Sequence, residues 1–156
     1  MTDVKDISIR DARLDDAPVL AALMTELGYP TEPVDMSAGL NNVLANPAFR
    51  TIVAEIDDGV VGFGGFRVGP TFEGDVLEGE IVALIVDPGY RSQGVGAAIV
   101  AEGEAWVIER GASSMMLGTR GDRKRAHTFY RREGYVEDGM RYRKNLDPGG
   151  PIGGAA

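Results

Sequence analysis

Cysteine is absent from the 156-residue sequence, and His127 is its only histidine. The lack of cysteine excludes disulfides, thiolate metal sites and a cysteine nucleophile, and a single histidine argues against a tight transition-metal site. We therefore expect no metal at the functional site. No apolar run approaches the roughly 18 residues of a membrane span, and the polar residues 1–6 lack the apolar stretch of a signal peptide. The sequence thus predicts a cytoplasmic protein with no membrane partner.

Positive charge is also scarce, because 16 Lys and Arg face 24 Asp and Glu and the net charge is −8. This balance argues against a nucleic-acid partner, which needs a broad basic surface. The basic residues nevertheless crowd into the last quarter of the chain, at Arg120, Arg123, Lys124, Arg125, Arg131, Arg132, Arg141, Arg143 and Lys144. They form either a local anion site or the solvated faces of a helix and an edge strand.

The length fits a single domain, which we place over residues 1–146. Residues 147–156 are rich in glycine and proline and too poor in apolar residues to pack, so we expect a disordered tail. Hydrophobic periodicity predicts strands over residues 7–10, 51–56, 60–68, 80–86, 113–119 and 135–145, and helices over residues 15–27, 36–44, 94–110 and 123–132. The nearly uniform apolar run 80–86 indicates a central strand covered on both faces.

A glycine-rich segment, residues 91–97, follows that strand and opens the next helix. The first amides of a helix have no intrahelical acceptor, and together with the helix dipole they attract an anion. Gly94 and Gly96 lack the Cβ atoms that would hold a diphosphate away, and Arg91 supplies a positive charge. The segment matches neither the Walker A loop nor the dinucleotide fingerprint, since no Gly-Lys-Ser/Thr follows and residue 99 is isoleucine. Taken alone, it fits equally well with glycines that serve only packing.

Two segments resemble motifs of the GNAT superfamily of N-acetyltransferases. Residues 80–97, EIVALIVDPGYRSQGVGA, are similar to its coenzyme A signature, and residues 123–135, RKRAHTFYRREGY, to its Ala-x-x-Phe-Tyr-x-x-x-Gly-Tyr/Phe element. Among the branches of the superfamily, the aminoalkylphosphonate N-acetyltransferases look most alike. The resemblance, over residues 7–145, implies an α+β fold in three layers: a mixed, mostly antiparallel central sheet with a splayed parallel strand pair and flanking helices.

The resemblance also implies acetyl-CoA as the cofactor, with its pantetheine arm between the splayed strands, residues 84–86 and 113–119. A backbone amide of residues 84–86 would then face the oxyanion of a tetrahedral intermediate. Arg123 stands where many relatives carry asparagine, so its target is either a pantetheine carbonyl or a phosphate. The implied cofactor-binding residues are Leu84, Ile85, Val86, Arg91, Ser92, Gln93, Gly94, Val95, Gly96, Ala97, Arg123, Ala126 and Phe129.

Glu80 is the candidate catalytic base, because direct transfer needs a neutral amine and alkylamines are protonated at neutral pH. It acts either directly or through water; the alternative is a carboxylate that only attracts a cationic substrate. Strand alternation is expected to put Glu80 on the same face as Val82, Leu84 and Val86.

Tyr130 is the candidate acid for the leaving thiolate, as its position in the second motif implies. Phe129 is expected to pack in the core, because neighbouring residues of a helix point about 100° apart. His127 lies three residues before Tyr130 and shares its helical face. An ordinary surface contact is the commoner role for such a histidine, so we do not assign it to catalysis.

The acceptor is expected to be a small cationic amine. Four carboxylates, at Glu73, Asp75, Glu78 and Glu80, fall within eight residues, which makes Glu73, Asp75 and Glu78 candidate substrate-binding residues. A phosphonate would be repelled from this loop unless a basic side chain from elsewhere reaches it.

Other functions stay open at this point. One is acetylation of a peptide or protein amine, and another is an acyl-CoA-binding sensor without turnover. A nucleotide-phosphate binder that uses the same glycine turn ranks last. Nothing in the sequence fixes the oligomeric state, although many relatives pair as homodimers.

Overall fold

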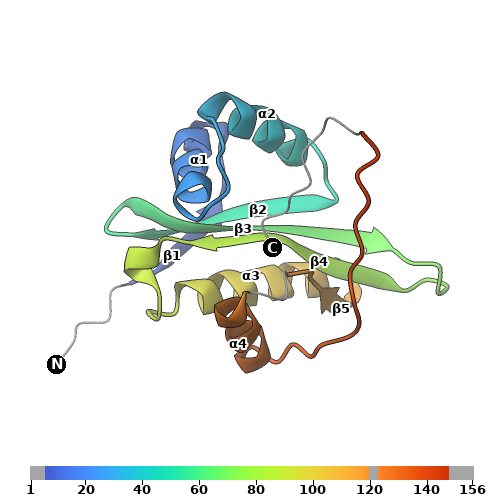
Figure 1. The fold of residues 1–156 in the computed structure, drawn as a ribbon. Coiled ribbons are helices and arrows are strands. Elements are labelled where there is room, and N and C mark those ends of the chain that lie inside the picture. Colours follow the sequence, from blue (N-terminus) through green and yellow to red (C-terminus); the bar gives the residue numbers. More distant parts are fainter. Residues whose placement is uncertain (1–5, 120–122, 148–156) are drawn as a thin grey trace.

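A five-stranded sheet forms the middle layer of the computed structural model, which describes residues 6–119 and 123–147 (Figure 1). Its strands follow the order of the chain: β1 (Ser8–Asp11), β2 (Phe49–Ile56), β3 (Gly59–Pro70), β4 (Leu77–Val86) and β5 (Ala112–Met116). The first three pairs are antiparallel, and β4–β5 is parallel. The mixed, mostly antiparallel sheet that the resemblance implied is therefore confirmed.

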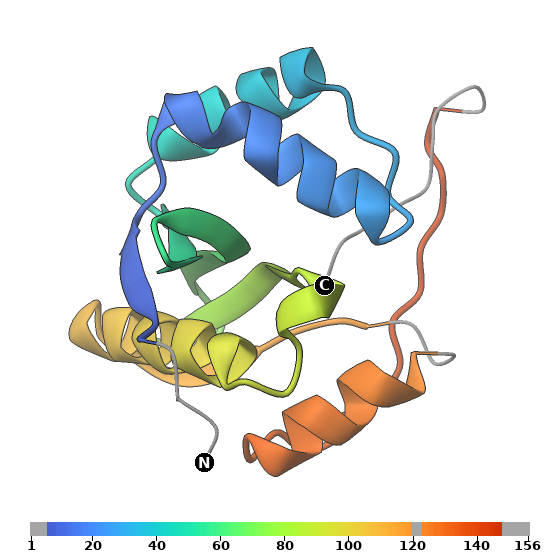
Figure 2. The same ribbon diagram turned by 90° about the vertical axis from the view of Figure 1, so that its left-hand side faces the viewer.

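Helices cover both faces of this sheet. The short η1 (Leu14–Asp16), α1 (Ala17–Glu26) and α2 (Pro33–Leu44) lie over one face, and α3 (Val95–Glu109) and α4 (Lys124–Arg132) over the other (Figures 1 and 2). One buried cluster, including Phe66 and Ile99, fills the α3 side, and a second, including Leu20 and Phe63, fills the α1–α2 side. The three-layer fold is confirmed. None of the described helices is long and apolar enough to cross a membrane.

Glycines let α3 approach the sheet closely. Phe66 of β3 is fully buried, and a Cβ on Gly103 of α3 would overlap its ring. A Cβ on Gly62 or Gly64 of β3 would run into Ile99. These glycines therefore serve helix–sheet packing, and the buried Phe66 fixes the position of α3 against β3.

A β-bulge at Val82 changes which face the residues of β4 occupy. Gly65 pairs with Ala83 while Phe66 pairs with Ile81, so Val82 has no partner residue across the strand pair. Ile81, Leu84 and Val86 pack in the α3-side cluster, whereas Ala83 and Ile85 pack in the α1–α2-side cluster. Because Glu80 precedes Ile81, it faces the α1–α2 side. The prediction that Glu80 shares a face with Leu84 and Val86 is wrong. The bulge adds one residue to β4 and interrupts the alternation of its side chains between the two faces of the sheet.

The prediction of a last strand over residues 135–145 is also wrong, because this segment forms no strand. Its apolar side chains Val136, Met140 and Tyr142 are each more than 80% exposed. The segment runs across the direction of the strands rather than along β5 (Figure 1). Alternation makes a strand only where a partner edge and a buried face exist, and this segment has neither. The expected tail lies almost wholly outside the described residues.

Candidate active site

The parallel strand pair separates halfway along β4. Pairing runs from Leu77–Ala112 to Glu80–Met116, where β5 ends. Residues 117–119, predicted to continue the strand, leave the sheet. Beyond Glu80, residues 81–86 of β4 pair with β3 on one edge, and no strand of the described chain pairs with the other. The backbone N–H and C=O groups of residues 81–86 along this unpaired edge are available to an extended ligand.

The glycine turn lies where this open edge ends. After β4 the chain makes η2 (Pro88–Tyr90), where the Asp87 carboxylate accepts a hydrogen bond from the Gly89 amide at 2.9 Å. Ser92 and Gly94 then take left-handed conformations, with φ of 63° and 86°. The Ala98 amide donates to the Gly94 carbonyl at 3.0 Å. The amides of residues 95–97 precede it, so they have no intrahelical acceptor, as an anion site at a helix start requires.

Glycine is favoured at residues 94 and 96 of the turn for different structural reasons. A Cβ on Gly94 would meet nothing within 4 Å, so the left-handed backbone is what favours glycine there. A Cβ on Gly96 would lie 3.2 Å from the Phe129 ring. The packing explanation that the sequence left open therefore applies at Gly96, whose missing side chain accommodates Phe129. Diphosphate binding by this turn stays a prediction. Val95 is buried in the core, so only its backbone is open to a ligand.

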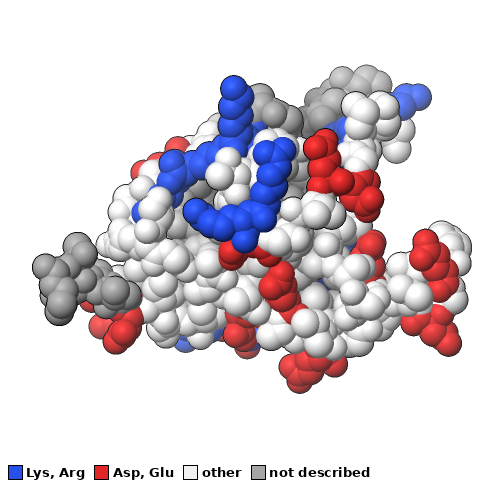
Figure 3. Space-filling model, turned by 90° about the horizontal axis from the view of Figure 1, so that it is seen from below, with Lys and Arg blue, Asp and Glu red and all other residues white. Residues whose placement is uncertain are grey.

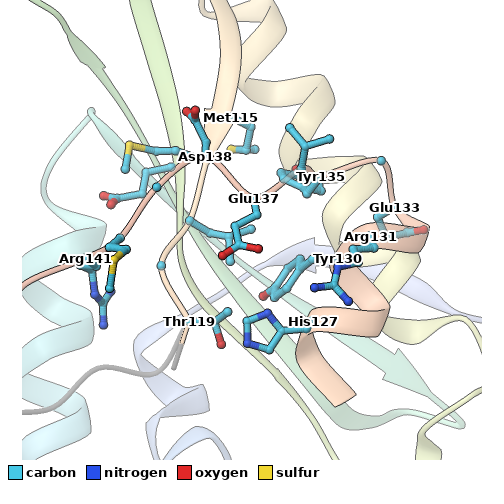
Figure 4. A pocket seen from close by; sticks show the side chains of 18 of the residues that line it. Met115, Thr119, His127, Tyr130, Arg131, Glu133, Tyr135, Glu137, Asp138 and Arg141 are labelled. Atoms are coloured by element: carbon cyan, nitrogen blue, oxygen red, sulfur yellow. The ribbon is translucent and has the colours of Figure 1, made fainter. Parts of the chain in front are cut away.

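A cleft at the point of strand separation is lined by both candidate catalytic residues, Glu80 and Tyr130. Figure 4 shows Tyr130 among the side chains that line it. Glu80 reaches it from the α1–α2 side of the sheet, and Tyr130 and Glu104 from the α4 and α3 side. Its walls come from segments far apart in the sequence: residues 28–30, Glu80, Glu104, residues 115–119, His127, Tyr130, Arg131, residues 133–141 and Arg143. The cleft thus lies where the pairing of β4 and β5 ends.

Tyr130 is held rigidly at this cleft. It is 7% exposed, and its ring meets Phe129 and Tyr135 edge-on, with centroids 5.2 and 5.9 Å away. Burial raises the pKa of Tyr130 to about 12, and the nearby Arg123 opposes this shift. The phenol therefore stays protonated at neutral pH and is able to donate. Phe129, expected in the core, is half-buried beside the same cluster.

Tyr135 ties α4 to α3, a contact that the sequence analysis missed. Gly134, with φ of 93°, ends α4, and the Tyr135 amide donates to the Tyr130 carbonyl at 2.9 Å. The Tyr135 hydroxyl donates to the Glu104 carboxylate at 2.8 Å. Burial and this bond raise the pKa of Tyr135. Tyr135 is the final tyrosine of the second motif, so the sequence marked the residue itself. Its partner Glu104, 31 residues away, is identified only by the fold.

Glu80 has a charged neighbour across the strand. Arg67 of β3 pairs with it in the sheet register and donates to its carboxylate at 2.6 Å. Glu80 is partly buried, with a side-chain exposure of 25%, against 49% for Arg67. Arg67 therefore orients the carboxylate of the candidate base. Glu78, on the same face, accepts a hydrogen bond from Ser114 at 3.5 Å and does not line the cleft.

The predicted acceptor loop does not reach the cleft. Glu73 and Asp75 lie at the exposed tip between β3 and β4, outside the cleft lining. Charged residues of the segment after α4 line the cleft instead: Glu137, Asp138, Arg141 and Arg143. The structure thus brings Glu80 together with this segment, and separates it from the other carboxylates of its own loop.

Arg123 directly precedes α4, and His127 lies within this helix. His127 lines the cleft near Thr119 and Tyr130 (Figure 4). Arg123 stacks on Tyr29 of the α1–α2 loop, with the guanidinium carbon 4.7 Å from the ring centroid. It acts electrostatically on Tyr130 but does not line the cleft itself.

The outer face of α4 forms a basic patch on an acidic protein. Lys124, Arg125, Arg131 and Arg132 are all exposed, and Figure 3 shows Lys and Arg side chains gathered on the side where α3 and α4 lie. Basic residues that lie close together in the last quarter of the sequence therefore also lie close together on the surface. It lies on the same side of the sheet as the glycine turn, where it attracts an anionic ligand.

Comparisons with known proteins agree with this geometry. A model of the acetyltransferase (GNAT) family matches residues 12–135. The aminoalkylphosphonate N-acetyltransferase of Salmonella typhimurium is 40% identical over 68 residues, which cover 44% of each chain. The uncharacterized N-acetyltransferase YhfO of Bacillus subtilis is 25% identical over 138 residues, 85% of this chain and 91% of that protein.

A solved structure has the same fold. The aminoglycoside N-acetyltransferase AAC(6')-Iy, in complex with CoA, superimposes with a TM-score of 0.75 at 18% identity and covers 91% of this chain and 97% of that one. The separated β4–β5 pair, the glycine turn and the match over most of the sequence lead to one conclusion: the chain belongs to the GNAT family of acetyltransferases.

Proposed function

We propose that the protein transfers an acetyl group from acetyl-CoA to the primary amine of a small molecule. The observation that carries this proposal is the cleft at the β4–β5 separation, which Glu80 and Tyr130 line from opposite sides of the sheet. A donor that enters from one side and an acceptor from the other would meet there.

The residues around the open edge fit coenzyme A. The unpaired amides of residues 95–97 and the left-handed backbone at Gly94 suit a diphosphate. Arg91, Ser92 and Gln93 lie in the same turn, and the open edge of residues 84–86 offers backbone partners to an extended pantetheine arm. Ala126 and Phe129 of α4 pack against the cluster beside that edge. When bound, the coenzyme supplies an activated thioester.

The chemistry then needs three proton transfers. Glu80 takes the proton of the ammonium group, directly or through water, so that the neutral nitrogen attacks the acetyl carbonyl carbon. A backbone amide of the open edge stabilises the negative charge on the oxygen. After the carbon–nitrogen bond has formed, the carbon–sulfur bond breaks and Tyr130 donates its proton to the leaving thiolate. The nitrogen then gives its surplus proton to the Tyr130 phenolate, which restores the phenol. Its protonated state at neutral pH supports this role.

The amine is a small molecule in this proposal. The match with an aminoalkylphosphonate N-acetyltransferase supports a small acceptor, and so does a cleft that the segment after α4 crosses. Cationic amines are attracted by Glu80 and Glu137, both of which line the cleft.

Free thiol released from acetyl-CoA tests the function. We expect at least one member of a panel of propylamine, spermidine, an aminoglycoside and a lysine peptide to accelerate thiol release well above hydrolysis. Tight CoA binding with no acceleration by any amine would indicate a sensor instead. Better thermal protection by ATP than by CoA would indicate a nucleotide binder.

A further inference from the structure

An arginine without a carboxylate partner lines the acceptor side of the cleft. Arg141 belongs to the segment after α4, and no described carboxylate forms an ion pair with it. Its side chain lies against Gly118, just past the end of β5, where a Cβ would overlap the guanidinium group. The missing side chain at residue 118 therefore leaves the space at the strand separation that Arg141 occupies.

Opposite charges line the same cleft at other positions. Glu80 enters from β4, and Glu137 points toward Tyr130, whereas Arg141 lies on the opposite side of the cleft (Figure 4). Glu104 also lines the cleft but already accepts the Tyr135 hydroxyl. Asp138 and Glu133 line it as well, and so does Arg143, which already has another interaction. A ligand with one charge would match only one part of this lining.

We infer that the acceptor carries an anionic group, such as a carboxylate or phosphonate, on the same small molecule as its amine. Arg141 binds this group. This inference rests on the proposed function. The ammonium end then lies toward Glu80, and the anionic end toward Arg141. Guanidinium groups bind carboxylates and phosphonates through charge-assisted, often paired hydrogen bonds. The acidic loop at Glu73 and Asp75, which would repel such a molecule, lies outside the cleft.

The test compares amines that differ only at the far end: propylamine, 3-aminopropanoate, 3-aminopropylphosphonate and 1,3-diaminopropane. We expect kcat/KM for the two anionic amines to exceed that for propylamine by about tenfold or more. The Arg141→Gln substitution should lower kcat/KM for the anionic amines by about 10- to 100-fold. It should leave propylamine within about threefold and the Kd for CoA unchanged, as expected for a contact to the acceptor alone.

Lys144→Gln is the matched control, because Lys144 carries the same charge on the same segment but does not line the cleft. It should not alter the preference among the four amines. The charge reversal Arg141→Glu should shift the preference toward 1,3-diaminopropane. Thermal shifts of the CoA complex with each amine provide a readout that needs no turnover.

The outcomes separate the two proposals. Equal kcat/KM for propylamine and the anionic amines, or an equal loss for all four amines in Arg141→Gln, would overturn the acceptor assignment alone. A fall in CoA affinity in that variant would assign Arg141 to the coenzyme instead. If no amine is turned over, the proposed function fails, and the acceptor assignment fails with it. Thermal shifts that depend on Arg141 and on the anionic group would then show only that Arg141 binds the anionic group of a ligand that is not acetylated.

Discussion

The two halves of the candidate active site are built in different ways. The coenzyme half uses one continuous stretch, β4, the glycine turn and the start of α3, supplemented by α4. The acceptor half combines the α1–α2 loop, Glu80, the residues after β5 and the segment after α4. A continuous stretch carries its geometry in local backbone preferences, whereas the acceptor half depends on how distant segments pack. Substitutions in the first half should act locally on coenzyme binding, and those in the second on turnover and acceptor choice.

The largest effect is expected from Tyr130→Phe. Without the hydroxyl, the leaving thiolate receives no proton, and kcat should fall by about 100-fold or more. The Kd for CoA should stay within about twofold, because the ring and its contacts with Phe129 and Tyr135 remain. Tyr142→Phe, at a side chain that is 86% exposed, is the control. Full activity of Tyr130→Phe would remove this residue from the mechanism.

Gly94→Val should weaken CoA binding by about 10- to 100-fold, measured by calorimetry. The β-branched residue is strained at φ of 86° and distorts the turn. Gly74→Val is the matched control, since Gly74 also has a positive φ, 73°, and open space around it, but lies at the tip between β3 and β4. Both variants should lose stability, and only Gly94→Val should lose affinity. Equal CoA affinity in the two variants would contradict the assignment of the turn.

Glu80→Gln should lower kcat by about tenfold near neutral pH, where most of the amine is protonated. The loss should shrink as the pH approaches the pKa of the free amine, because the acceptor then arrives neutral. Glu78→Gln, two residues earlier on the same face and outside the cleft, should retain nearly full activity. A loss in Glu80→Gln that does not change with pH would limit Glu80 to binding.

Gly103→Ala tests the packing of α3 and should lower the free energy of unfolding by about 3 kcal/mol, since the added Cβ would overlap the fully buried Phe66 ring. Gly39→Ala in α2 is the counterpart. It has no neighbour within 4 Å, and it should raise stability by about 0.5–1 kcal/mol through helix propensity. Chemical denaturation measures both values, and a stabilised Gly103→Ala variant would contradict the packing.

Alkaline pH is expected to lower the stability of the protein through Tyr130. Burial raises the pKa of Tyr130 from 10 in the unfolded chain to about 12, so its contribution is intact below pH 10 and is lost as the pH rises toward 12. This loss amounts to about 2 kcal/mol. Unfolding free energy should therefore fall more steeply between pH 10 and 12 in the wild type than in Tyr130→Phe. Parallel curves would show that Tyr130 is not buried.

Local patterns predicted most of the fold. The apolar run in β4 and the four helices follow from hydrophobic periodicity, and the three-layer arrangement was implied by the resemblance to the family. Two of the failed predictions have a common cause. The bulge at Val82 reverses the alternation of β4, and residues 135–145 alternate without finding a strand partner. Both outcomes depend on a neighbouring strand, which local periodicity does not describe.

The sequence by itself determined the family, the glycine turn and the pair of candidate catalytic residues, because these lie in short motifs whose spacing is set by backbone geometry. Only the tertiary structure decided what surrounds them. It showed that Gly96 accommodates Phe129, that Glu104 anchors Tyr135, and that Arg141 rather than Glu73 and Asp75 lines the acceptor side. Each of these relations joins residues more than 20 positions apart, and long-range packing sets such distances.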